Sequence, residues 1–173
     1  PPATMASASP YCQALLLLAF LLAGHFVMSQ VAGDFRTNKA TVTWLTPGDW
    51  ERYNGTSWVT ATEYPGQNSG TGTVTIRNNQ NVSLGSTVPN AIGALTFEAG
   101  NNAMNLTFGG AYTLNITGTV TINGPNNNGT RYIAVDAGTL NCGSLSLGST
   151  DNDSKIAQLR ISTGTVTVGG NLT

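Results

Sequence analysis

Residues 72–76 read GTVTI, and the same five residues return at 118–122 and, with a final Val, at 164–168. Both intervals are 46 residues long, from 72 to 118 and from 118 to 164. In each copy Thr alternates with an aliphatic residue, which is typical of a half-buried strand whose aliphatic side chains point inward. A strand motif that returns at a constant interval predicts a repeat architecture of stacked units.

The same alternation fills the whole region 72–173. It forms runs of four to six residues, separated by turn formers such as Gly109-Gly110. The apolar pairs expected to point inward are Val74/Ile76, Val82/Leu84, Leu95/Phe97, Leu106/Phe108, Leu114/Ile116, Val120/Ile122, Ile133/Val135, Leu140/Cys142, Leu145/Leu147, Leu159/Ile161 and Val166/Val168. One copy holds about five strands, which we interpret as two rungs of roughly 20 to 26 residues. The predicted fold class is all-β, a parallel β-helix.

An antiparallel sandwich or barrel is the main alternative fold, because short strands between turns describe those folds too. In a stack of rungs, the same residue types are expected at the same position of successive rungs, and the 46-residue repeat shows such a recurrence. Hairpin signals are sparse, and the one clear pair, Asn123-Gly124, is followed by Pro125, which is unsuited to a two-residue hairpin. The pattern therefore favours the parallel coil.

Residues 30–71 differ in character from the repeats. Their clear strand residues are Val42 and Val59, and the segment is rich in aromatic residues, namely Trp44, Trp50, Tyr53, Trp58 and Tyr64. A coil must cover its open ends, so we predict that this segment is a cap on the first rung. At the other end the chain stops at Thr173 within a third copy, and we expect further rungs in a longer protein.

The N-terminal residues indicate export. Residues 14–23 read ALLLLAFLLA, which is too short for a confident membrane span and fits a signal peptide better than a buried helix. The start is Met5, preceded by artefact residues, and no Lys or Arg precedes the apolar run as a signal normally requires. We assign residues 1–29 to this signal, with cleavage near Ser29. The expected location is secreted or cell surface, with no membrane span in the mature chain.

Charge and reactive side chains point away from several functions. Seven Lys and Arg stand against eight Asp and Glu, so no basic field is expected to attract nucleic acid. The single histidine, His25, lies in the predicted signal, which leaves no imidazole base or metal ligand. Cys142 is the one thiol of the predicted mature chain, so no internal disulfide is expected.

A carboxylate-based glycosidase needs two or three acidic side chains that converge on one groove. The acidic residues of this chain do not recur at the repeat interval and are scattered along the sequence. Arg131 and Asp136 form the one nearby basic and acidic pair on a strand. Residues 151–154, DNDS, offer four oxygen-bearing side chains but lack the Gly and the distant Glu of a calcium loop, and we interpret them as a solvated turn. We therefore expect no enzyme activity, no metal and no cofactor.

Two sets of side chains could form a binding surface. Trp44, Trp50 and Trp58 are possible stacking faces for sugar rings, although aromatic residues in a cap are more often buried. The Thr residues of the three GTVT copies could form a flat array like those of some ice-binding proteins. On alternate rungs, however, this array would be sparse, and Thr is in any case what an exposed strand favours.

Trp44, residues 50–59 (WERYNGTSWV) and Pro65, followed by the strand pairs at Val74 and Val82, carry a family resemblance. The chain resembles the β-strand-repeat, pectin-lyase-like proteins that Gram-negative bacteria export to their surface, many of them described as adhesin-like. This resemblance implies a right-handed coil and a surface location, and it implies no enzyme. We expect a structural or adhesive module, with extracellular polysaccharide or matrix components as partners. The alternative is a polysaccharide-binding or polysaccharide-degrading β-helix whose active rungs lie beyond Thr173.

Overall fold

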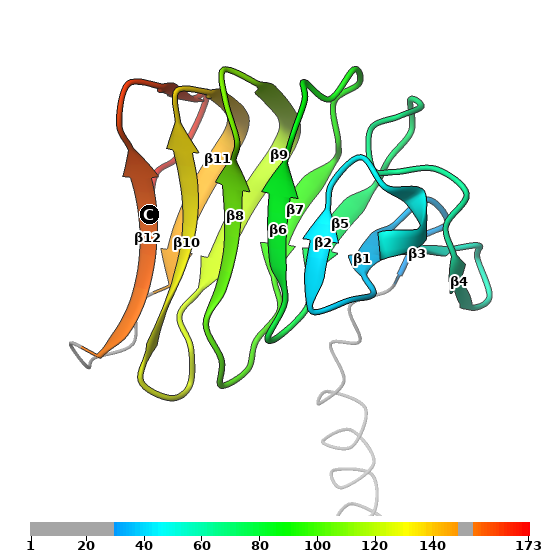
Figure 1. Cartoon of the computed structure of the whole chain (residues 1–173), viewed down its shortest axis with the longest axis horizontal. Helices are drawn as coiled ribbons and strands as arrows, with labels where there is room; N and C mark the ends of the chain where they lie inside the picture. The colour runs from blue at the N-terminus through cyan, green and yellow to red at the C-terminus, as the bar shows by residue number, and fades with distance from the viewer. Residues whose placement is uncertain (1–29, 149–153) are drawn as a thin grey trace, which may run out of the picture.

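The computed structural model describes residues 30–148 and 154–173, and it shows a β-solenoid of parallel stacked coils (Figure 1). The predicted signal peptide and most of the DNDS turn lie outside the described residues. The strands are β1 (Phe35–Thr37), β2 (Thr41–Thr43), β3 (Trp50–Tyr53), β4 (Trp58–Thr60), β5 (Thr73–Ile76), β6 (Asn81–Leu84), β7 (Ala94–Phe97), β8 (Met104–Phe108), β9 (Thr113–Asn123), β10 (Gly129–Asp136), β11 (Thr139–Gly148), β12 (Lys155–Ile161) and β13 (Thr165–Val168). Within these residues the one helical element is a 3-10 turn, Pro47–Asp49, and no helix could cross a membrane.

The strands form two sheets whose order shows how the chain coils. One sheet runs β13-β11-β9-β7-β5-β1-β3-β4, and the other runs β12-β10-β8-β6-β2. The chain alternates between the two sheets, and each strand from β5 onward pairs in parallel with the strand one coil earlier. Figure 1 shows the five-stranded sheet in front of the other. The predicted parallel coil is confirmed and the antiparallel alternative is excluded.

The inward residues predicted from period two form the core. From Val74 to Leu145 every predicted inward residue is buried, and the core cluster continues through the whole stack. Leu147, Leu159, Val166 and Val168 are partly buried against that cluster, and Ile161 is exposed, at 51%. A register shift between Ala134 and Asp136 sets Ile161 opposite the exposed Asp136. Ile161 also lies on β12, which pairs with β10 alone and forms the end of its sheet.

The coil begins earlier than the sequence suggested. β1 and β2, within the predicted cap, already pair in parallel with β5 and β6. The antiparallel part is limited to β3 and β4, which extend the larger sheet beyond β1. Residues 30–71 thus supply a first rung as well as a cover.

The 46-residue repeat describes only its first interval correctly. We use the word column for a set of strand positions that stack directly on one another from rung to rung. Val74 pairs with Leu95, and Leu95 pairs with Val120, so the first two GTVTI copies lie in one column, two rungs apart. The third copy was expected in the same column. Val166 instead pairs with Leu140, which pairs with Leu114, in the neighbouring column of the larger sheet. From β5 onward the rungs vary in length, from 21 residues (74 to 95) to 27 (106 to 133), so sequence spacing alone does not preserve the column.

The Gly of the repeat lies at a corner where backbones approach closely. The N–H of Gly93 donates to the carbonyl of Gly72, and the N–H of Gly118 donates to that of Gly93 at 2.8 Å. A Cβ on Gly118 would lie 2.6 Å from the Gly93 oxygen, and one on Gly143 would lie 2.5 Å from the Thr117 oxygen. Such distances exclude any side chain unless the rungs separate, which explains why Gly precedes the strand motif.

A buried arginine joins the turns at another corner. Arg131 on β10 is 0% exposed, and it donates to the carbonyls of Asn102, Glu98, Asn123 and Gly100 at 2.8 to 3.1 Å. Burial lowers the pKa of this guanidinium, and the Glu98 carboxylate opposes that change. Its acceptors belong to two successive rungs. Arg131 therefore holds together the stacked turns that follow β7 and β9.

Candidate functional site

The three tryptophans of the cap have different environments. Trp44 and Trp50 are both 0% exposed and meet edge to face, with their ring centroids 5.1 Å apart. The Nε1–H of Trp44 donates to the Pro65 carbonyl, and that of Trp50 donates to the Trp44 carbonyl. Neither indole can stack on a sugar, so the prediction of stacking faces at these two positions is corrected. They instead close the end of the coil.

Trp58 is different, because β4 is the edge strand of the larger sheet and leaves its indole half-buried at the surface. Tyr53, its partner across β3 and β4, packs with a centroid distance of 5.4 Å. The guanidinium carbon of Arg36 on β1 lies 4.4 Å from the indole centroid. This cation–π contact fixes the indole orientation while leaving part of the ring accessible.

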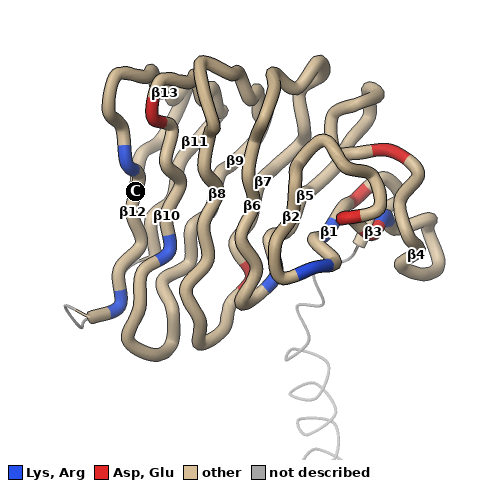
Figure 2. The backbone as a smooth tube through the Cα atoms, in the orientation of Figure 1, with Lys and Arg blue, Asp and Glu red and all other residues tan. Residues whose placement is uncertain are grey.

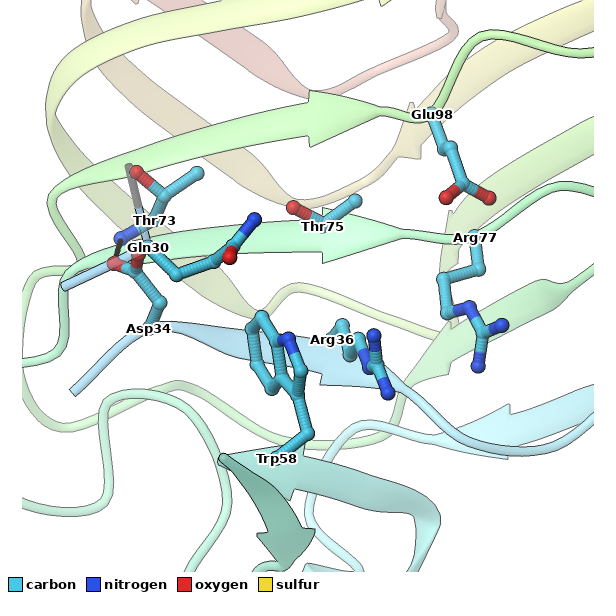
Figure 3. A pocket seen from close by; sticks show the side chains of 8 residues that line it. All are labelled: Gln30, Asp34, Arg36, Trp58, Thr73, Thr75, Arg77 and Glu98. Carbon is cyan, nitrogen blue, oxygen red and sulfur yellow. Dashed lines mark hydrogen bonds between the residues drawn. The ribbon is translucent and has the colours of Figure 1, made fainter. Parts of the chain in front are cut away.

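A groove of about 210 Å³ lies beside Trp58, where the cap joins the coil (Figure 3). In Figure 3 the indole rises from β4 toward Gln30 and toward the strand that carries Thr73 and Thr75. The lining residues come from four separate segments of the chain, and they are Gln30, Asp34, Arg36, Trp58, Thr73, Thr75, Arg77 and Glu98. The groove therefore depends on the register of β1, β5 and β7 rather than on any single motif.

The carboxylates around the groove already make hydrogen bonds and ion pairs within the protein. Asp34 accepts the backbone N–H groups of Val31 and Thr73, both at 2.8 Å, and ties the start of the described chain to β5. Glu51, behind the groove, lies 2.5 Å from Arg36 Nε and 4.0 Å from Arg77 Nη1. One carboxylate thus faces two guanidinium groups.

Several polar atoms of the groove have no hydrogen-bond partner among the described residues. Arg36 uses its Nε on Glu51, and its two terminal nitrogens remain unbonded. Glu98 accepts the N–H of Asn78 through Oε2, which leaves Oε1. The hydroxyl of Thr75 makes no hydrogen bond within the described chain and is half-buried on the outer face of β5. The groove can therefore both donate and accept beside an aromatic surface.

A row of hydroxyl side chains leads from the groove along the stack. Thr75 lies opposite Thr96, Thr96 opposite Thr121, and Thr121 opposite Ser146. We name these four residues the hydroxyl row. All are half-buried and alternate with inward apolar residues, which are buried except for the partly buried Leu147. The prediction that the GTVT threonines recur on alternate rungs holds for the first two copies, and it is wrong for the third, which stacks in the neighbouring column. The row is denser than predicted because Thr96 and Ser146 supply hydroxyl groups on the other rungs.

The other candidates from the sequence have structural roles or none. Arg131 does not face Asp136, because its side chain points inward to carbonyls whereas Asp136 is exposed. Cys142 is buried, and burial raises the pKa of its thiol, which makes the thiolate unfavourable. Among residues 30–148 and 154–173, no three His, Cys, Asp or Glu side chains gather as a metal site would require.

Charge is distributed unevenly over the molecule. Figure 2 shows most of the Lys, Arg, Asp and Glu near β1 to β4, with a smaller group on β10 and β12. The outer face of the larger sheet between these regions carries Thr, Ser, Asn and Ala side chains on β5, β7, β9 and β11. The hydroxyl row therefore runs over an uncharged surface.

Comparison with family models, with curated proteins and with solved structures gives no match for this chain. The β-solenoid is shown by the strand pairing, and the resemblance to pectin-lyase-like surface proteins stays a prediction from the sequence.

Sequence reasoning missed the groove residues other than Trp58. Arg36, Arg77 and Glu98 lie far apart in sequence, and only the parallel register brings them together. The alternation of inward and outward side chains along a strand was one available signal. Arg36 falls between the inward residues Phe35 and Thr37, so it must point outward on a first-rung strand. That signal required β1 to be recognised as a strand.

Proposed function

We propose that this chain is a non-catalytic structural or adhesive module that works outside the cell, as a secreted or surface-attached scaffold. The observation that carries the proposal is the continuous parallel ladder, in which the strands of each sheet pair from one coil to the next around one uninterrupted core. A stack of this kind gives length and stiffness through backbone hydrogen bonds, without metal or disulfide bonds.

Location outside the cell is supported by three features of the sequence. These are the apolar N-terminal run, the low content of charged residues, and the resemblance to exported β-strand-repeat proteins. A surface rich in Thr, Asn and Gly also suits a protein whose turns and outer strand faces are exposed. The adhesive part of the proposal is supported by the groove at the junction of cap and coil, which offers unbonded polar groups beside Trp58.

An adhesion assay tests this function directly. The chain from Gln30 onward is coupled to beads, which are applied under flow to surfaces coated with polysaccharides and matrix proteins, and the supernatant is assayed for new reducing ends. We expect retention on at least one coating, without release of reducing ends. Time-dependent release that a Glu98→Gln variant abolishes would show an enzyme and would overturn the non-catalytic assignment. Absence of retention on every coating would remove the adhesive role.

Stiffness is tested separately by pulling single molecules. Because each rung contacts only its neighbours, we expect resistance to force followed by stepwise loss of rungs. Unfolding at low force in a single step would contradict a mechanical scaffold, whatever the adhesion assay shows.

A further inference from the structure

We infer that the groove beside Trp58 and the hydroxyl row together form one binding surface for a linear, uncharged polysaccharide that lies along the stacking axis. The inference deepens the adhesive role proposed above and rests on it. It names the ligand class and the direction in which the ligand lies.

The groove supplies the end that anchors the ligand. The accessible part of the Trp58 indole offers an apolar surface for the C–H face of a sugar ring. Around it stand the terminal nitrogens of Arg36 as donors and Oε1 of Glu98 as an acceptor, neither of them bonded within the described chain. Sugar hydroxyls both donate and accept, so this mixture of groups matches a sugar better than a purely apolar or a purely ionic ligand.

The charges of the groove favour a neutral ligand. Two guanidinium groups, Arg36 and Arg77, share the carboxylate of Glu51. Asp34 and Glu98 add two further carboxylates to the lining. No excess of positive charge remains to attract an acidic polymer, and the outer face along the hydroxyl row carries no charged residue between the groove and Ser146.

The hydroxyl row supplies the length. Thr75 belongs to the groove, and Thr96, Thr121 and Ser146 follow on the next three rungs. Neighbouring strands of a sheet lie about 4.8 Å apart, so the hydroxyl groups repeat at that distance along the axis. A periodic polymer can contact such a row at several rungs at once, whereas a short ligand reaches only the groove.

The experiment measures binding as a function of ligand length. The chain from Gln30 onward is titrated with neutral oligosaccharides of two to six units from cellulose, mannan and xylan, using calorimetry and tryptophan emission. We expect affinity to rise with length in at least one series, with a change in the emission of Trp58. Alginate and heparin serve as charged probes at low and high salt.

Four variants, one of them a control, separate the two parts of the surface. Trp58→Ala should weaken binding at every length by at least about tenfold, because the anchoring surface is lost. Thr121→Val should weaken hexasaccharide binding several-fold and leave disaccharide binding unchanged. Thr107→Val, on the outer face of β8 in the other sheet, is the matched control and should change neither. Thermal melts confirm folding of each variant. Glu98→Gln is the second test of the groove, because it keeps an acceptor for the N–H of Asn78.

Absence of saturable binding by all three neutral series would overturn the inference of a polysaccharide-binding surface. Binding that Trp58→Ala and Glu98→Gln both leave intact would overturn it as well. Affinity independent of length would remove the hydroxyl row from the surface. Salt-sensitive binding of alginate or heparin alone would replace the neutral ligand with an acidic one. Each of these results can occur while the scaffold still resists force, so failure here is distinguishable from failure of the proposed function.

Discussion

The cap and the coil are stabilised in different ways. In the coil, rungs are joined by backbone pairing, and aliphatic residues repeat inside it so regularly that few outward side chains are essential. In the cap, residues 30–71 are held by individual side-chain contacts, among them the two buried indoles and the hydrogen bonds of Asp34 and Asp49. The difference teaches that the coil should fail where its backbone stacking is disturbed, and the cap where a single polar contact is lost.

Arg131 should be the most sensitive position, because it is the one point where the coil depends on a single polar side chain. We expect Arg131→Met to lower the free energy of unfolding by about 4 kcal/mol, since four carbonyls lose the hydrogen bonds of the guanidinium and, within the described chain, only that of Gly100 keeps a second donor, the N–H of Asn126. Chemical denaturation measures the change. Arg160→Met is the control, because that arginine is exposed above Tyr132 and should cost less than about 1 kcal/mol. Equal losses for the two variants would contradict the structural role of Arg131.

Gly118→Ala tests the corner of the coil. The added Cβ would lie 2.6 Å from the carbonyl oxygen of Gly93, so the two rungs must separate. We expect a loss of about 3 kcal/mol, the upper end of the usual cost of overpacking. Gly85→Ala is the matched control, since a Cβ there meets nothing within 4 Å. A Gly118→Ala variant as stable as this control would show that the rungs are not tightly stacked at that corner.

Trp50→Phe tests the cap through one hydrogen bond. The substitution keeps an aromatic ring in the core but removes the Nε1–H that donates to the Trp44 carbonyl at 2.9 Å. We expect a loss of about 2 kcal/mol, from the unpaired carbonyl and the smaller ring. Trp58→Phe should cost less than about 1 kcal/mol, because that indole is half-buried and donates no hydrogen bond within the described chain. Differential scanning calorimetry of both variants makes the comparison.

The sequence predicted the strands well because period-two alternation is a local property. Residues such as Val74, Leu106 and Leu140 point inward wherever their strand is placed. Arg131 carried the same signal, since it shares parity with Ile133 and Val135, although the sequence offered it only as a basic partner for Asp136. Inward placement became possible only because the carbonyls of neighbouring turns converge on it, which is a tertiary property.

The column of each strand and the exposure of each tryptophan could not be read from the sequence. A column depends on the number of residues in every preceding turn. From β5 onward the rungs differ by up to six residues (21 against 27), so Val166 lies over Leu140 instead of extending the first column. Trp58 differs from Trp50 because β4 has no further neighbour in its sheet. The groove depends on the stacking of the strands and on the exposure of Trp58. For this reason the sequence predicted only one of its residues, Trp58.

Asp49 gives the smallest effect and the one that depends on pH. It is nearly buried, which disfavours its charged form, but Lys39 and the N–H of Thr43 bond to the carboxylate and hold its pKa below the ordinary value. A lowered pKa in the folded state stabilises the protein above the unfolded value of about 3.9 and loses that effect as pH falls through the folded value. We therefore expect Asp49→Asn to cost about 1 kcal/mol at pH 7 and progressively less below pH 4, measured by urea denaturation across this range. Asp136→Asn, at an exposed position, is the matched control. A constant difference between wild type and Asp49→Asn at all pH values would mean that the cap relies on the shape of this side chain and not on its charge.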